Sequence, residues 1–142
     1  MSEASRQAKL YFEQCKADLK TAKKFFRSDN HEKCALMSVQ AVSNCLSSIC
    51  LSMNRVQNPT YNMTDMLKIC ANKYEEFSEL SRTCEEMDSI QDYKLFDKHV
   101  KGGKKITQDE TKSFLDNATK LIKHTEKIIK QYKILPLPLL GL

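Results

Sequence analysis

The basic residues of this sequence are its best candidates for chemistry, because their type and spacing would allow them to bind phosphate. The two candidate groups are Lys16, Lys20, Lys23 and Arg27 near the start, and Lys98, Lys101, Lys104 and Lys105 further on. The first group recurs every three or four residues, which places it on one side of a helix. Clustered basic residues attract anions such as a nucleotide or RNA. The alternative interpretation is a basic helix face that only meets water.

Cysteine and histidine offer little chemistry in this pattern. The six cysteines are Cys15, Cys34, Cys45, Cys50, Cys70 and Cys84, and none of them forms a C-x-x-C pair. The three histidines lie far apart in the sequence, whereas zinc sites use closely spaced ligands. Several cysteines fall at the apolar positions of predicted helices, so we expect buried thiols rather than nucleophiles. We therefore expect no metal site, no cofactor and, since no secretory leader opens the sequence, a cytoplasmic location.

Helices must position these residues. The 142 residues predict one domain, and the small number of Gly and Pro (three each) together with long runs of helical periodicity indicates an all-α protein. The first helix is predicted from Ser2 to Arg27, with an apolar stripe opposite its lysines. Asp29, three residues before Glu32, is expected to cap the next helix. That helix should begin near Asn30 and return antiparallel to the first, because the connection is short.

The second helix is the predicted core. Residues 34–53 contain no charged residue, and apolar side chains fall on nearly every side, so the other helices should cover it. The stretch is long enough to cross a bilayer. However, Gln40 and Asn44 lie in its middle, and their amides favour a soluble bundle in which partners satisfy them. We therefore predict a buried helix that ends near Asn54, two core polar residues and no membrane.

Further helices complete the predicted bundle. A third helix should open after Thr64 and either continue or break and restart near Phe77, within a strongly acidic segment. Thr107 and Glu110 have the spacing of a capping box, which predicts the start of a long last helix. We expect residues 1–133 to form an up-and-down bundle of four to five helices. The apolar tail at 134–142, which contains two prolines, should pack on the bundle or a second copy, or bind a partner.

Two short segments are similar to a known family. Residues 15–22 read CKADLKTA and residues 40–47 read QAVSNCLS. They resemble the A-x-x-D-L-x-x-A and Q-A-x-E-K-A-L-K patterns of the first two helices of HEPN domains. Gln40, Ala41 and Leu46 match the second pattern, whereas Ser43, Asn44 and Ser47 replace its charged residues. The segments at 3–6 and 31–34 are similar to the HEPN domain that ends the large chaperone-like protein sacsin.

The resemblance implies a helical bundle that is commonly a homodimer. Members of the family act as ribonuclease toxins, as partners of minimal nucleotidyltransferases, or as non-catalytic nucleotide-binding or dimerisation modules. For this chain it therefore implies a homodimer, a nucleotide or RNA as ligand, and a protein partner of the nucleotidyltransferase or chaperone type.

The residues for ribonuclease chemistry do not match the family pattern well. Catalytic HEPN ribonucleases carry Arg and His a few residues apart on one helix, where Arg neutralises the phosphate and His moves the proton of the 2′-hydroxyl. Arg27 and His31 have three residues between them, but the predicted turn separates them. We expect no enzyme but a non-catalytic HEPN-like module for self-association and for binding a nucleotide, another polyanion or a protein. The alternatives are a HEPN ribonuclease with a degenerate Arg/His motif and a purely structural interaction adaptor.

Overall fold

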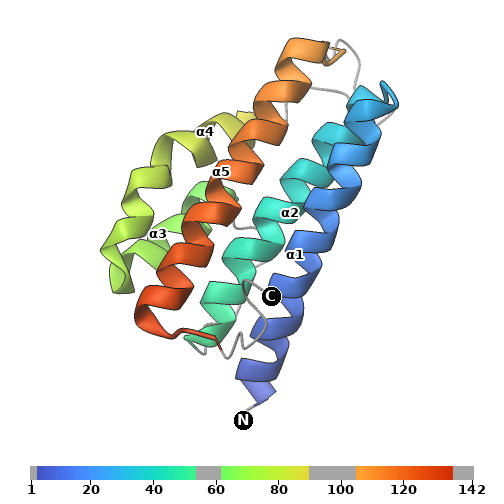
Figure 1. Cartoon of the computed structure of the whole chain (residues 1–142). Coiled ribbons are helices and arrows are strands. Elements are labelled where there is room, and N and C mark those ends of the chain that lie inside the picture. Colours follow the sequence, from blue (N-terminus) through green and yellow to red (C-terminus); the bar gives the residue numbers. More distant parts are fainter. Residues whose placement is uncertain (1–2, 54–61, 90–104, 136–142) are drawn as a thin grey trace.

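The computed structural model describes residues 3–53, 62–89 and 105–135. Every regular element in these ranges is a helix: α1 (Glu3–Arg27), α2 (His31–Ser52), α3 (Met63–Lys73), the 3-10 helix η1 (Glu75–Leu80), α4 (Ser81–Asp88) and α5 (Gln108–Tyr132). The prediction of an all-α bundle is confirmed. The three long helices, α1, α2 and α5, lie side by side, and α3, η1 and α4 pack beside α2 and α5, away from α1 (Figure 1).

A tight turn joins α1 to α2 and makes them antiparallel neighbours. Asp29 has a φ of 58°, and the amide of Asn30 donates a hydrogen bond to the carbonyl of Phe25 at 2.9 Å. Asn30 caps α2, because its side chain accepts a hydrogen bond from the amide of Lys33 at 3.3 Å. The prediction that Asp29 caps α2 is therefore wrong. Asp29 instead takes the left-handed conformation that follows the end of α1, which aspartate tolerates better than most residues.

The centre of the core is α2, although one side of its first half is open to solvent. Val42, Leu46 and Ile49 have no exposed surface. Gln40, by contrast, is exposed, so its prediction as a core polar residue is wrong. The reason is that α3 covers only the second half of α2, where the Ser47 hydroxyl lies 3.8 Å from a methionine sulfur of α3. No helix of the described ranges covers the corresponding side of the first half.

The length and apolarity of α2 would allow it to cross a membrane, and among the described residues it is the one helix of which this is true. Of its most apolar stretch, 67% is buried inside the protein, as in the core helix of a bundle. The amide of Asn44 also has a partner there, described below.

The middle of the chain forms three short helices, α3, η1 and α4. α3 ends at Lys73, Tyr74 is extended with a φ of −123°, and the chain restarts at once as η1. Asp88, at the end of α4, returns to the start of α3 and accepts hydrogen bonds at 2.9 Å from the amides of Met63 and Thr64. These two amides have no partner within their helix, so the carboxylate of Asp88 ties the ends of this segment together.

The last helix begins as predicted. Thr107 Oγ1 accepts a hydrogen bond from the amide of Glu110 at 3.1 Å, and Glu110 Oε1 accepts one from the amide of Thr107 at 3.0 Å, which confirms the capping box. α5 ends at Tyr132, and the next residue, Lys133, caps the helix in the left-handed conformation with a φ of 52°. The next residues turn back onto the bundle, and Leu135 is only 5% exposed within the core. The rest of the predicted tail, 136–142, lies outside the described residues.

Candidate functional site

The charges of α1 gather along its edge with α5. Lys16, Lys20, Lys23 and Arg27 are all exposed, and their spacing of four, three and four residues keeps them on one strip of the helix. Lys16 shows where this strip meets α5, because its Nζ lies 3.3 Å from Oε1 of Glu126. The strip therefore runs along the edge between α1 and α5.

The last helix adds a cation to the same edge. α5 runs antiparallel to α1 (Figure 1), and Lys123 precedes Glu126 by three residues, so the two lie on one side of α5. We call this surface the basic face and define it as Lys16, Lys20, Lys23, Arg27 and Lys123. Within the described ranges, Lys16 is the one member that forms an ion pair. The other four cations remain available to a phosphate.

The second predicted group of lysines is described at one position. Lys105 lies at the turn between α1 and α2, where it lines a pocket of about 370 Å³ together with Asp29, His31 and Glu32. The structure thus brings Lys105 to the end of α1 at which Arg27 stands. Lys98, Lys101 and Lys104 lie outside the described residues. The two carboxylates in this pocket make it less basic than the edge between α1 and α5.

Arg27 and His31 belong to different helices. Arg27 is the last residue of α1 and is exposed, and its Nε donates a hydrogen bond to the carbonyl of Lys23 at 3.4 Å. His31 is the first residue of α2, and its Nδ1 is buried with no hydrogen-bond partner. The pair that would carry ribonuclease chemistry is thus split by a turn, with the arginine in solvent and one nitrogen of the histidine inside.

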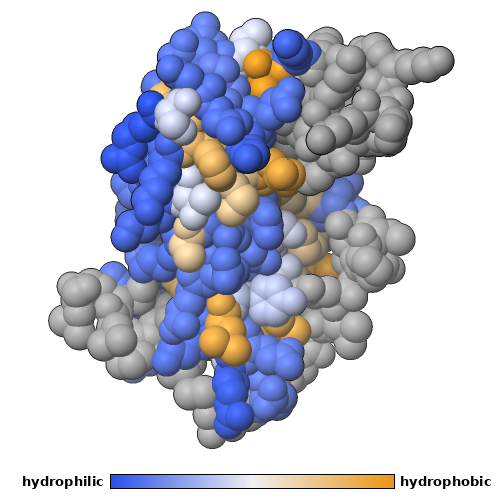
Figure 2. Space-filling view, turned by 90° about the vertical axis from the view of Figure 1, so that its right-hand side faces the viewer, coloured by the Kyte–Doolittle hydropathy of each residue, from blue (hydrophilic) through white to orange (hydrophobic). Residues whose placement is uncertain are grey.

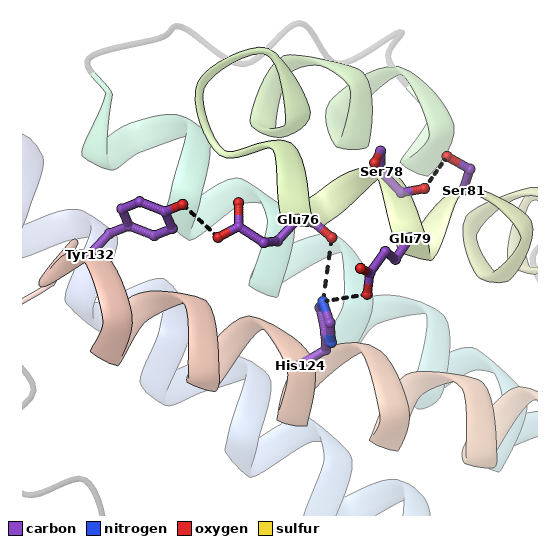
Figure 3. A network of polar contacts seen from close by, with 6 residues as sticks. All are labelled: Glu76, Ser78, Glu79, Ser81, His124 and Tyr132. Atoms are coloured by element: carbon purple, nitrogen blue, oxygen red, sulfur yellow. Dashed lines mark hydrogen bonds and ion pairs between the residues drawn. The ribbon is translucent and has the colours of Figure 1, made fainter.

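A second histidine belongs to a polar network between α5 and η1 (Figure 3). His124 Nε2 lies 3.3 Å from the backbone oxygen of Glu76 and 3.6 Å from Oε2 of Glu79. Eight residues further along α5, the hydroxyl of Tyr132 donates a hydrogen bond to Oε2 of Glu76 at 2.5 Å. This bond lowers the pKa of the Glu76 carboxyl and raises the pKa of the Tyr132 phenol. The network joins α5 to η1, so we interpret it as a structural clamp.

Sequence reasoning missed a buried carboxylate on α1. Asp18 is 3% exposed and accepts hydrogen bonds from Gln14 Nε2 at 2.8 Å and from Asn44 Nδ2 at 2.7 Å. A signal was present, because Asp18 lies three residues after Cys15 and four before Ala22, both of which have no exposed surface. Asn44 is half-buried. The prediction of a soluble bundle required a hydrogen-bond partner for its amide, and Asp18 is that partner.

All six cysteines are buried as thiols and not as disulfides. The sulfurs of Cys50 and Cys70 lie 3.9 Å apart. The hydrogen bond with Cys50 and burial raise the pKa of Cys70, and burial raises the pKa of Cys84 to about 12. A thiol with a raised pKa stays protonated and unreactive at neutral pH. Across residues 3–53, 62–89 and 105–135, no three His, Cys, Asp or Glu side chains gather in a way that could hold a metal ion.

Comparisons with known proteins agree with this architecture. Residues 8–135 match the family model of the HEPN domain, which is most of the chain, so the chain belongs to the HEPN domain family. Among solved structures, it is similar to a HEPN domain protein from Thermotoga maritima, with a TM-score of 0.65 over 84% of this chain and 97% of that one. Their sequences are 19% identical, so this likeness shows the shared fold. No curated protein sequence matches the chain. The predicted family is confirmed, and the likeness to the domain of sacsin stays a prediction.

Proposed function

We propose that this chain is a non-catalytic HEPN module that binds a polyanion, such as a nucleotide or RNA, and associates with a second copy of itself. The observation that supports polyanion binding is the basic face. From Lys16 to Arg27 its four cations on α1 extend over about 16 Å at 1.5 Å per residue, which is long enough to meet several phosphates. Lys123 adds a fifth cation from α5, and four of the five have no acidic partner among the described residues.

The chemistry of this face favours loose binding to phosphate over recognition of bases. Four of its five cations are lysines, which act as point charges and lack the planar fork with which arginine binds phosphate in two places. Each side chain is exposed to water, so salt screens its charge. We therefore expect weak binding that depends little on sequence and falls steeply as salt rises.

The proposal of a non-catalytic role rests on the separation of Arg27 from His31. A ribonuclease with a degenerate Arg/His motif is the alternative, and it needs both side chains at one phosphate. We expect the purified protein to leave RNA intact. Cleavage by the wild type that an Arg27→Ala/His31→Ala variant loses would establish the alternative instead.

Calorimetric titration with ATP and with a single-stranded RNA oligonucleotide tests the binding proposal. Titrations at about 50 mM and about 200 mM salt should show binding that weakens at least tenfold at the higher salt. A Lys20→Glu/Lys23→Glu variant should lose binding at both. The matched control is Lys68→Glu/Lys73→Glu on α3, which changes the net charge equally away from the basic face and should keep most of the affinity. Absence of heat for wild type at low salt would refute polyanion binding.

Two further proposals concern the location of the protein in the cell and a protein partner. The six buried thiols suit a reducing compartment, which supports a cytoplasmic location. A protein partner of the nucleotidyltransferase or chaperone type follows from family membership alone. Co-purification from native cells, followed by mass spectrometry, would identify such a partner directly.

A further inference from the structure

The last helix carries more exposed lysines than the basic face includes. At 100° per residue, positions 120, 123, 127 and 130 of α5 share about a quarter of the helix circumference, and each is an exposed lysine. Glu126, paired with Lys16, marks the side of α5 that lies beside α1. The lysine strip begins next to that side and faces solvent, because the opposite side of α5 is buried in the core. We call the basic face together with Lys120, Lys127 and Lys130 the two-helix basic surface.

The two-helix basic surface contains few exposed carboxylates. Residues 16–27 contain one acidic residue, Asp18, which is 3% exposed. Residues 120–130 also contain one, Glu126, and its partner is a lysine of α1. Glu13, one turn before this stretch, is the nearest exposed carboxylate on α1. The cations of the two helices are therefore in large excess over a surface about 20 Å across.

The same surface offers contacts to phosphate but no platform for bases. Proteins that bind single-stranded nucleic acid stack its bases on exposed aromatic rings. Among the described residues, the exposed large hydrophobic side chains are Leu10, Tyr11 and Tyr132, and none of them belongs to the two-helix basic surface. The ring of Phe12, whose centroid lies 6.0 Å from Lys16 Nζ, has no exposed surface. Figure 2 looks onto the side of the molecule where α1 lies and shows mostly hydrophilic surface with small apolar areas. A ligand that presents anionic groups without bases therefore suits this surface.

The width of the two-helix basic surface favours a flat ligand. Its two strips belong to α1 and α5, which lie side by side (Figure 1). The major groove of duplex DNA is about 12 Å wide and admits one helix, and that of duplex RNA is narrower still. Two adjacent helices are about 20 Å wide, so they do not enter such a groove together. The surface of a lipid bilayer is flat on this scale, so its headgroups can meet both strips at once.

The exposed acidic residues of η1 and α4 lie on the other side of α5. His124 and Glu126 are two residues apart, which places them about 200° apart around the helix. His124 contacts Glu79 of η1, whereas Glu126 contacts Lys16 of α1. The acidic residues therefore lie across α5 from the lysines of α1. Such an asymmetry orients a protein on an anionic surface, because that surface attracts the basic side and repels the acidic one.

We propose that the two-helix basic surface docks on an anionic lipid bilayer, an inference that rests on the proposed polyanion binding. Clusters of about four to eight Lys and Arg on an amphipathic helix are typical of segments that bind anionic lipids. The lysines meet phosphate and carboxylate headgroups, and no helix enters the bilayer. The prediction of no membrane was drawn from α2 as a helix that could cross one, and here α2 stays in the core of the bundle. The anionic leaflet of the cell membrane faces the cytoplasm, which agrees with the proposed location.

Co-sedimentation with lipid vesicles tests this inference. The wild type should sediment with vesicles of about 70% phosphatidylcholine and about 30% phosphatidylserine, and at least tenfold less with pure phosphatidylcholine. Raising the salt from about 50 to about 500 mM should release it. A Lys120→Glu/Lys127→Glu variant, which changes α5 outside the basic face, should bind at least tenfold more weakly. The control Lys68→Glu/Lys73→Glu on α3 changes the net charge equally and should keep most of the binding, and circular dichroism checks that both variants fold.

The outcomes separate the bilayer from polyanions in general. If the protein gives heat in the RNA titration but does not bind the phosphatidylserine vesicles, the inference is overturned and the proposed function stands. If it binds neither, polyanion binding falls as well. Equal binding to pure phosphatidylcholine overturns the inference, because charge would then not drive the contact. A Lys120→Glu/Lys127→Glu variant that binds vesicles like the wild type also overturns it, because the strip of α5 would then take no part.

Discussion

Asn44 on α2 donates a hydrogen bond from its Nδ2 to Oδ2 of Asp18 on α1, at 2.7 Å. The bond crosses the most extensive helix contact of the bundle and satisfies a carboxylate that is 3% exposed. Replacement of Asn44 by alanine would leave this buried oxygen without a donor. We expect Asn44→Ala to lower the free energy of unfolding by about 1–3 kcal/mol, measured by urea denaturation.

A matched substitution on the same helix distinguishes this bond from a general loss of helix contacts. Gln40 lies four residues earlier and is exposed, so Gln40→Ala should change the free energy of unfolding by less than about 0.5 kcal/mol. Equal effects of the two substitutions would show that the bond to Asp18 does not stabilise the helix pair.

The capping box of α5 gives a second stability prediction. Thr107→Ala removes the oxygen that accepts from the amide of Glu110, so it should lower the free energy of unfolding by about 1 kcal/mol. Thr119→Ala is the control, because the hydroxyl of Thr119 only donates to the carbonyl of Leu115 within the helix. Thermal denaturation of both variants would measure the difference, and the cap has no role if both behave as wild type.

The buried thiols predict a loss of stability at high pH. Burial raises the pKa of Cys34 and Cys84 above the ordinary value of 9.0, to about 12 for Cys84. The unfolded chain therefore loses these protons first as pH rises past about 9, so stability is complete below that pH and falls above it. Urea midpoints at about pH 7 and about pH 10 should show this fall. A Cys34→Ala/Cys84→Ala variant should show a smaller one, and an equal fall would point to other groups.

The clamp between α5 and η1 has a pH window of its own. The bond between Tyr132 and Glu76 lowers the pKa of the carboxyl from 4.5 and raises the pKa of the phenol from 10.0. Its stabilisation is thus present above pH 4.5, disappears as acid protonates Glu76, and also fades as alkali ionises Tyr132. Tyr132→Phe should melt at a lower temperature than wild type at neutral pH. The difference should shrink as the pH falls below 4.5 and acid protonates Glu76. A difference that does not change with pH would show that ring packing, and not the hydrogen bond, is lost.

Much of the fold was predictable because it follows from local patterns. The spacing of Thr107 and Glu110 fixes the start of α5, and the apolar period of α1 fixes which side it buries. The burial of Gln40 and Asp18 was not predictable in the same way, because it depends on which neighbouring helix lies beside each residue. Gln40 is exposed because no other described helix covers its side of α2. Asp18 is buried because the amide of Asn44, from another helix, donates a hydrogen bond to it.

The candidate site was predictable in part for a similar reason. Lys16, Lys20, Lys23 and Arg27 share a strip because helical spacing alone requires it. Lys123 could not be assigned to the same surface, because only the contact between Lys16 and Glu126 shows which side of α5 lies beside α1.

The central claim is that one HEPN module both binds a polyanion and associates with a second copy of itself. Sedimentation velocity of the wild-type protein mixed with a short single-stranded RNA tests it most directly. We expect the RNA to sediment with a protein dimer, because both activities are proposed for the same folded module. An RNA that sediments only with protein monomers, or that splits the dimer as it binds, would contradict the claim.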